Sequence, residues 1–242
     1  AASLLGRYSI SNAGRAALGE VISGTLRKKV LRGEALDDAE RLMNSPMLAS
    51  KNAPRNIVEM ELRKKDDYFL DLIIKKRGEP EEDVLLSKIA HAKIDSEYLS
   101  DDEAVNLASQ IFVAGNETTT SLISNLIWRM LTFENLWQDF VGNKINIDDA
   151  INESLRFDPP LLGLFKTTTR DVDINGSTIP KNTKVLMHYG AANRDPKIFN
   201  NPNEFIISRD GSKVISFSVG IHICLGRELA KLETRVALNA LR

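Results

Sequence analysis

The segment Phe217-Ser218-Val219-Gly220-Ile221-His222-Ile223-Cys224-Leu225-Gly226 decides how this chain is interpreted. It joins a turn-rich stretch to a final helical pattern, and glycines stand four residues before and two residues after the only cysteine of the sequence. Glycine allows positive φ angles and lets the backbone approach a flat ligand closely. We expect Cys224 to lie at the N-terminus of the final helix, where free N–H groups and the helix dipole favour a thiolate. A thiolate is the electron-donating type of proximal ligand to haem iron.

Other interpretations of the same residues stay open at this point. A lone cysteine is most often a small buried apolar residue. A structural zinc site needs four ligands, and the sequence offers one cysteine and three histidines, His91, His188 and His222, without a recognisable ligand spacing. A nucleophilic Cys224–His222 pair is also conceivable, although two residues this close within a glycine loop are poorly placed for a mutual hydrogen bond.

The composition excludes several broad classes of protein. The 242 residues are 43% hydrophobic and 27% charged, which suffices for a sizeable core and argues against wholesale disorder. The formal net charge is -1, so no basic excess indicates a nucleic-acid partner. No apolar run approaches the roughly 20 residues that span a bilayer, and no signal peptide opens the chain. We therefore expect a cytoplasmic protein without a membrane anchor, and the single cysteine excludes an intramolecular disulfide framework.

The residue patterns predict a mainly α domain with a minor antiparallel β-sheet over residues 54–242. Residues 1–53 form a poorly readable N-terminal segment, because glycines interrupt its weak helical patterns. We predict helices over 56–77, 83–92, 100–131 and 147–157, and from about 225 to the end. Short strands are predicted over 165–174, 177–180 and 185–189, with Asn175-Gly176 as a hairpin turn.

The longest predicted helix has an unusual middle. Ser100 and Glu103 fit a capping box at its start, and Ala114-Gly115-Asn116-Glu117-Thr118-Thr119-Thr120 places poor helix formers in its interior. Such residues can mark a functional site, or they can be tolerated with the threonines bonding back to the preceding turn. The segment alone does not decide between these interpretations. Glu153 and Arg156, three residues apart on another helix, by themselves indicate no more than an ordinary surface ion pair.

Taken together, these segments resemble the cytochrome P-450 superfamily. The family's haem-binding signature, Phe-x-x-Gly-x-Arg/His-x-Cys-x-Gly, matches at every fixed position, which are Phe217, Gly220, His222, Cys224 and Gly226. Further motifs follow in the family's order: Ala-Gly-x-Asp/Glu-Thr at 114–118, Glu-x-x-Arg at 153–156, and the stretch from Ala192-Asn193-Arg194-Asp195-Pro196 to Arg209. The resemblance covers about residues 56–242, and a full family member is much longer. We therefore expect a chain that is truncated or incomplete relative to the soluble bacterial and archaeal members.

The resemblance implies a cytochrome P-450-like fold and haem b (iron protoporphyrin IX) as the cofactor. Cys224 would be the axial thiolate and the metal ligand. Ala114 and Gly115 would let the haem approach the long helix at a kink. Lys166 stands near the place where many bacterial members have an arginine, and it would bind one haem propionate while His222 binds the other. Lysine keeps the positive charge but lacks the bidentate fork of arginine.

The resemblance also implies catalytic and structural roles. Glu117 and Thr118 would form the acid–alcohol pair that delivers protons for O–O cleavage. Glu153, Arg156 and Arg209 would form the family's structural ion triad, which locks the loop that carries the cysteine. Such a triad is expected to be buried, and breaking it would leave an unpaired charge.

The implied function is that of a haem-dependent monooxygenase, which hydroxylates an apolar small molecule with dioxygen and two electrons from a ferredoxin- or flavodoxin-type donor. Leu161–Leu164 and Phe165 would line the substrate pocket. Arg227, Lys231 and Arg235 are spaced by four residues and predict a basic stripe on which an acidic donor could dock. The alternatives are a peroxide-using relative, against which the intact acid–alcohol pair argues, and a non-catalytic haem-binding protein.

Overall fold

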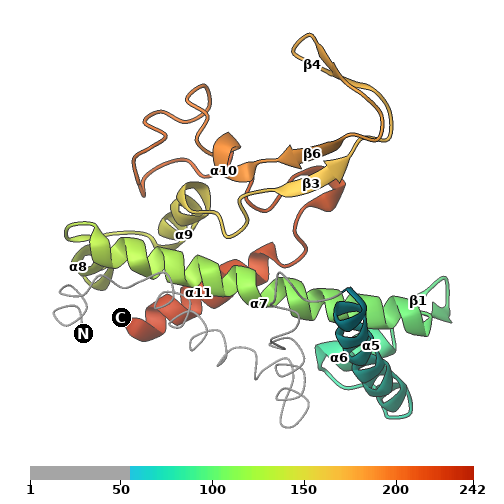
Figure 1. The fold of residues 1–242 in the computed structure, drawn as a ribbon. Helices are drawn as coiled ribbons and strands as arrows, with labels where there is room; N and C mark the ends of the chain where they lie inside the picture. Colours follow the sequence, from blue (N-terminus) through green and yellow to red (C-terminus); the bar gives the residue numbers. More distant parts are fainter. Residues whose placement is uncertain (1–54) are drawn as a thin grey trace. The chain divides into compact units, whose positions relative to one another are not determined.

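The computed structural model describes residues 55–242, so the poorly readable segment 1–53 lies outside the described residues. The described chain belongs to two compact units, of which the first ends at Glu117 and the second is Thr118–Arg242. The boundary falls inside the longest helix, α7 (Asp101–Thr132), which contributes to both units. Figure 1 follows the chain through these elements.

The first unit is built from helices around an apolar cluster. It holds α5 (Arg55–Arg77), α6 (Leu85–Ala90), the antiparallel strands β1 (Lys93–Ile94) and β2 (Glu97–Tyr98), and the start of α7. Phe69 and Ile73 of α5 are almost completely buried in this cluster. Phe69 meets Phe112 of α7 edge to face, with ring centroids 5.8 Å apart. The predicted helices over 56–77 and 83–92 are thereby confirmed to within a few residues.

Helix α7 begins as the sequence predicts. The Ser100 N–H donates to Glu103 Oε2 (2.9 Å) and the Glu103 N–H donates to Ser100 Oγ (3.3 Å), which completes the capping box. The helix then runs without interruption through residues 114–120. Its second half buries apolar side chains at helical spacing, namely Leu122, Ile123, Leu126, Ile127 and Met130. Packing of this face compensates for the poor intrinsic helix formers in the middle.

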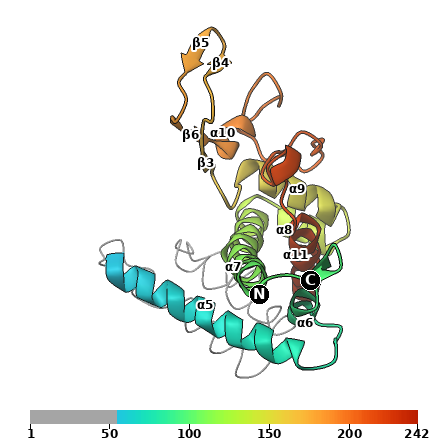
Figure 2. The same ribbon diagram turned by 90° about the vertical axis from the view of Figure 1, so that its right-hand side faces the viewer.

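The second unit contains α9 (Ile147–Phe157), which has the predicted bounds. Its other helices are α8 (Leu136–Val141), α10 (Tyr189–Ala192) and α11 (Arg227–Leu241), with a 3-10 turn, η1 (Gly220–His222), before α11. Asn146 caps α9, because its side-chain oxygen accepts the Asp148 N–H (2.8 Å). Helices α9 and α11 lie side by side (Figure 2), and Arg235 Nε is 2.9 Å from Asp148 Oδ1. Where the chain is described, each of its helices is too short or too polar to span a bilayer.

The predicted minor sheet is divided into two short antiparallel pairs. Strand β3 (Leu164–Thr167) pairs with β6 (Lys184–Met187), and β4 (Val172–Ile174) pairs with β5 (Ser177–Ile179). Asn175 (φ 50°) and Gly176 (φ 80°) form the predicted hairpin turn between β4 and β5. The expected single strand over 165–174 is wrong, because β3 ends at Thr167, the chain bends at residues 169–170, and β4 begins only at Val172. Thr168 still bonds to the segment before β6: its N–H donates to the Thr183 carbonyl (3.0 Å), and its Oγ1 accepts the Thr183 N–H (2.9 Å).

Candidate functional site

Cys224 lies in a loop that folds back on itself. Its N–H donates to the Phe217 carbonyl (2.8 Å), which closes the loop around η1. Helix α11 begins at Arg227 with Gly226 at its N-cap, so the helix starts later than expected and Cys224 precedes the cap by two residues. The cysteine amide is therefore bonded within the loop rather than left free at a helix N-terminus. The thiol side chain is exposed.

The surface around Cys224 is apolar and uncovered. Ile221 is 96% exposed and Leu225 is 87% exposed. A Cβ built on Gly220 or Gly226 would meet nothing within 4 Å, and Gly220 also has a left-handed φ of 71°. Open space beside two glycines, next to an exposed thiol and apolar side chains, fits a flat apolar group.

The side chains that could ligate a metal near Cys224 also favour a haem. Among the described residues, no group of three or more His, Cys, Asp or Glu side chains could hold a metal ion. A site with one protein sulfur would suit a haem iron, because the porphyrin itself would supply most of the other ligands. The residues that surround Cys224 therefore fit a haem better than the zinc alternative left open by the sequence.

Glu153, Arg156 and Arg209 lie together, and the first two are buried. Arg156 is 0% exposed, and its Nε and Nη2 donate to the two Glu153 carboxylate oxygens (2.8 and 2.7 Å). Arg209 Nε lies 3.4 Å from Glu153 Oε2, and Arg209 Nη1 donates to the Asn200 carbonyl (2.6 Å). The ordinary surface pair that the spacing alone suggests is thus a buried centre of charge.

This centre binds the backbone of the segment that leads to the cysteine. Arg156 donates to the carbonyls of Pro202 (2.8 Å) and Glu204 (2.8 Å), and Glu153 Oε1 accepts the Ile206 N–H (2.7 Å). The segment has little regular structure of its own, so these hydrogen bonds determine its course over α9.

The four predicted residues of α7 are divided between the units. Ala114, Gly115 and Glu117 are exposed and belong to the first unit, whereas Thr118 is half-buried and begins the second. A Cβ built on Gly115 would meet nothing within 4 Å, so that position is open. Their grouping around a haem stays a prediction.

Lys166 stands on β3 opposite Val185 and is exposed, as is His222 in η1. Neighbouring apolar side chains are exposed too, including Phe165 (59%). Lys184 Nζ lies above the Phe165 ring, 4.4 Å from its centroid. Both side chains that are predicted to bind haem propionates are thus accessible at the surface. Their use by a haem stays a prediction.

The basic stripe of α11 is less positive than its spacing predicts. Arg235 pairs with Asp148 of α9, and Arg227 Nε lies 2.9 Å from Glu228 Oε1. Lys231 Nζ lies 6.0 Å from the centroid of the Phe217 ring, directly beside the cysteine loop. The stripe therefore has one lysine and one half-exposed arginine that an acidic partner could reach.

Sequence reasoning missed a second arginine clamp. Arg129 of α7 forms two bonds to Asp158, with Nε–Oδ2 at 2.5 Å and Nη2–Oδ1 at 3.0 Å. One turn earlier, Asn125 Nδ2 donates to the Asp158 carbonyl (3.1 Å). The Arg129 guanidinium also lies 4.8 Å from the Phe157 ring centroid. The only sequence signal was the i,i+4 spacing of an amide and a guanidinium on one helix face.

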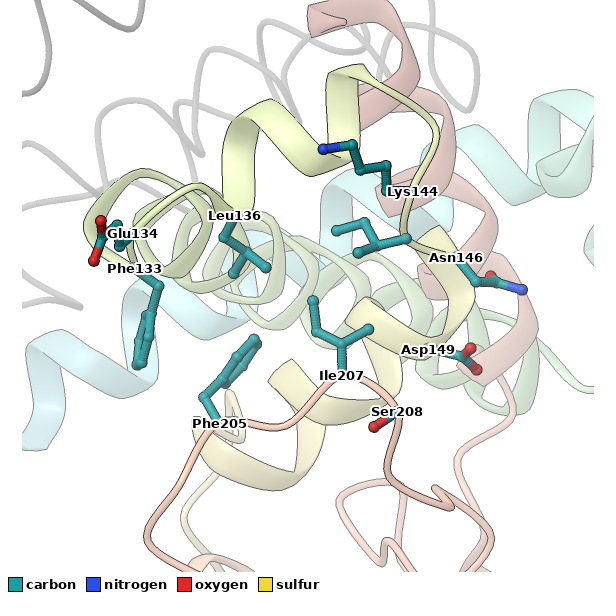
Figure 3. A pocket seen from close by; sticks show the side chains of 10 residues that line it. Phe133, Glu134, Leu136, Lys144, Asn146, Asp149, Phe205, Ile207 and Ser208 are labelled. Carbon is teal, nitrogen blue, oxygen red and sulfur yellow. The ribbon is translucent and has the colours of Figure 1, made fainter.

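A separate cavity of about 590 Å³ opens between α8, the start of α9 and the segment 205–208. Figure 3 shows the apolar side chains of Phe133, Leu136, Phe205 and Ile207 turned toward the same space. The rings of Phe133 and Phe205 are 5.5 Å apart. None of the predicted haem-site residues lines this cavity.

Comparison with known proteins decides the family. The family model described as Cytochrome P450 matches residues 147–241, which include the buried ion centre and the cysteine loop. The chain is 40% identical over 176 residues to cytochrome P450 109 of Bacillus spizizenii, an alignment that covers 72% of this chain and 43% of that protein. The chain belongs to the cytochrome P450 superfamily. The predicted family and fold class are thereby confirmed.

Other P450 relatives extend the comparison. The vitamin D(3) 25-hydroxylase of Pseudonocardia autotrophica is 36% identical over 191 residues, covering 78% of this chain and 47% of that protein. The P450 monooxygenase TamI matches with a TM-score of 0.80 at 27% identity, over 95% of this chain and 55% of the other. A mutant of P450 EryK in complex with erythromycin B matches with a TM-score of 0.82 at 27% identity, over 98% and 63%.

The chain spans about half the length of the curated relatives that it matches, between 43% and 52% for the first three. Members of the P450 family are haem-thiolate monooxygenases and bind haem b.

Proposed function

We propose that this chain forms the haem-thiolate part of a monooxygenase that hydroxylates an apolar small molecule with dioxygen and two electrons from a redox partner. The observation that carries the proposal is the exposed Cys224 in an open, apolar glycine loop. When bound, haem b would supply the oxygen and electron chemistry that amino-acid side chains lack. The protein would supply the ligand, the pocket and the protons.

Cys224 is proposed as the only protein ligand of the iron. Its backbone is held by the bond from its N–H to the Phe217 carbonyl (2.8 Å), so the sulfur is presented from a closed loop. Gly220 and Gly226 leave the adjoining space free of side chains. Lys166 and His222 are proposed to bind the two propionates, Lys166 as a point charge and His222 through a ring nitrogen.

Glu117 and Thr118 are proposed to move protons to the site where oxygen is reduced. Glu117 is exposed, so its carboxylate can exchange protons with solvent. Thr118, the next residue on α7, is half-buried and carries a hydroxyl that can accept and donate a hydrogen bond at once. An acid at the surface followed by an alcohol further in has the order that a proton relay needs.

The substrate is proposed to be apolar. Apolar side chains on β3 and β6 and in the loop before β3 are exposed, namely Leu161, Leu164, Phe165, Leu186 and Met187. Relatives carry names for hydroxylation of vitamin D(3) and of 6-deoxyerythronolide B, both at 36% identity or above. A ferredoxin- or flavodoxin-type donor is proposed to dock at Arg227 and Lys231.

The experiment compares wild-type protein and Cys224→Ser after haem loading, by the absorption of the reduced carbonyl complex. Wild-type protein is expected to show a thiolate-type spectrum, and the variant is expected to lose it, because a serine hydroxyl is a poor donor to iron. Ser212→Ala, which removes only a hydroxyl bound to Asp210 (2.7 Å), is the control and should behave as wild type. A thiolate-type spectrum in Cys224→Ser would overturn the ligand assignment.

Turnover assays separate the remaining alternatives. Product formation that requires a reduced ferredoxin or flavodoxin supports the monooxygenase. Product formation with hydrogen peroxide and without a donor would favour the peroxide-using alternative. Haem binding with neither activity would favour a non-catalytic protein.

A further inference from the structure

The cysteine loop has little apolar packing to hold its shape. Residues 219–229 are exposed. Ser218 has a left-handed φ of 62°, which is strained for a residue with a Cβ, and Gly220 follows with a φ of 71°. A loop with these properties needs support from outside its own residues.

A buried polar chain supplies support at the start of the loop. Asn193 is 0% exposed, its Oδ1 accepts the Ile215 N–H (3.0 Å), and its Nδ2 donates to Ser216 Oγ (2.7 Å). Ser216 Oγ in turn donates to the Leu155 carbonyl in α9 (2.6 Å). The Asn193 carbonyl accepts from Arg156 Nη1 (3.1 Å), which connects this chain to the buried ion centre.

The donor and acceptor roles in this chain follow from chemistry. A backbone N–H can only donate, so the Asn193 atom that faces Ile215 must be the amide oxygen. A carbonyl can only accept, so the single proton of the Ser216 hydroxyl points to Leu155 and the hydroxyl must accept from Asn193. Each polar atom has a partner, which is the condition under which a buried network makes a segment rigid.

The network ends next to the atom that holds the cysteine. Tyr189 Oη lies 3.3 Å from Ser218 Oγ, and the Ser218 N–H donates to the Ile215 carbonyl (2.8 Å). Phe217 stands between the anchored residues Ser216 and Ser218, and its carbonyl accepts the Cys224 N–H. A shift at residue 216 would therefore move the acceptor of the Cys224 amide.

We propose that Asn193 and Ser216 are positioning residues, which hold Cys224 in the place where its thiolate binds haem by fixing the Phe217 carbonyl. The proposal rests on the proposed function of Cys224 as the iron ligand. Asn193 and Ser216 are not proposed to touch the reacting atoms. Both act on Cys224 through the backbone between residues 215 and 224.

The test uses haem-loaded protein and two measurements, hydrogen exchange at the Cys224 amide and the thiolate-type absorption of the reduced carbonyl complex. Asn193→Asp keeps the shape but removes the donor to Ser216, and Ser216→Ala removes the connection to Leu155. Both variants are expected to exchange the Cys224 amide about tenfold faster, which corresponds to about 1.4 kcal/mol. Both are also expected to lose at least about half of the thiolate-type absorption, since a misplaced sulfur no longer ligates every molecule.

Two comparisons separate positioning from general destabilisation. Ser216→Thr keeps the hydroxyl and should retain both wild-type properties. Ser212→Ala removes a serine hydroxyl from the same segment without touching the network, and it should also behave as wild type. If Asn193→Asp fails to fold, the contrast between Ser216→Ala and Ser216→Thr decides.

Either of two results would overturn the proposal. Unchanged Cys224 amide exchange in Ser216→Ala would show that the network does not hold the loop. Faster exchange with undiminished thiolate-type absorption would show that the held position does not matter for ligation. Retention of that absorption in Cys224→Ser would instead refute the proposed function, so the two failures are distinguishable.

Discussion

Replacing Arg156 by methionine tests how strongly the buried ion centre stabilises the second unit. The Arg156 guanidinium donates to both Glu153 carboxylate oxygens (2.8 and 2.7 Å). It also donates to the carbonyls of Asn193 (3.1 Å), Pro202 (2.8 Å) and Glu204 (2.8 Å). Methionine is of similar length but offers no donor, so every one of these bonds is lost.

The magnitude follows from burial. The variant leaves the Glu153 carboxylate, whose side chain is 2% exposed, without its main partner. Removing one member of a buried pair costs about 3–5 kcal/mol, and each orphaned carbonyl adds on the order of 1 kcal/mol. We expect a loss of at least about 5 kcal/mol, which is comparable with the roughly 5–15 kcal/mol of an entire domain.

Arg129→Met is the matched control. Arg129 also binds a carboxylate through two nitrogens, but its side chain and that of Asp158 are each 24% exposed. Partial solvation screens the charges, so we expect a loss of only about 1 kcal/mol. Both variants remove a two-point arginine–carboxylate contact, but only Arg156 is fully buried and also binds backbone carbonyls.

The assay is urea unfolding followed by circular dichroism, with the slope m checked for equality among the variants. A double variant of Glu153→Gln and Arg156→Met should lose less stability than the sum of the single variants, because the first change removes the charge that the second would strand. A loss in Arg156→Met no larger than that in Arg129→Met would refute the argument that burial determines the magnitude.

Three further predictions concern the proton path, the donor surface and the cap of α7. Thr118→Ala should lower the product formed per electron pair consumed by roughly tenfold or more, since a positioned proton donor contributes at least that much; unchanged coupling would leave Thr118 as a packing residue. Arg227→Glu with Lys231→Glu should slow electron transfer from an acidic donor and flatten its dependence on ionic strength, and stopped-flow rates against salt concentration measure this. The hydrogen bonds from the Ser100 N–H and hydroxyl lower the pKa of Glu103. Their stabilising effect is therefore present above the ordinary carboxylate range and is lost as the pH falls through the lowered pKa, so melting temperatures against pH should show a shallower acid decline in Ser100→Ala.

Local features of the fold could be predicted because they depend on neighbours in sequence. The helix over 147–157 and the hairpin turn at Asn175-Gly176 are confirmed, since the helical period, the cap and the turn residues all lie within the element itself. Helix α8 was missed because it is only 6 residues long and follows Asn135, which has a left-handed φ of 62°. The strand over 165–174 failed because the chain bends at residues 169–170, between β3 and β4, which alternation of residues within the strand does not show.

The candidate site shows the same division. The signature around Cys224 could be recognised, but the start of α11 could not be placed, because the Cys224 N–H is bonded to a residue seven positions earlier. Glu153 and Arg156 have the same i,i+3 spacing whether exposed or buried. Only the contacts with residues about 40–50 positions away distinguish the two cases, and no local pattern encodes them.

The exposed apolar loop also has a thermodynamic consequence for the proposed function. Ile221 and Leu225 have almost their full surface in water, so they contribute little to the stability of the chain without a cofactor. Covering such side chains with a flat apolar group stabilises the folded state specifically, because the unfolded chain has no closed loop to bind it. In the chain without a cofactor, the loop is held by buried polar residues that lie outside it, among them Arg156 and Asn193. Altering Ile221 should therefore change haem affinity and the stability of the haem-loaded chain together. Altering Arg129 should change the stability of the chain without a matching change in haem affinity.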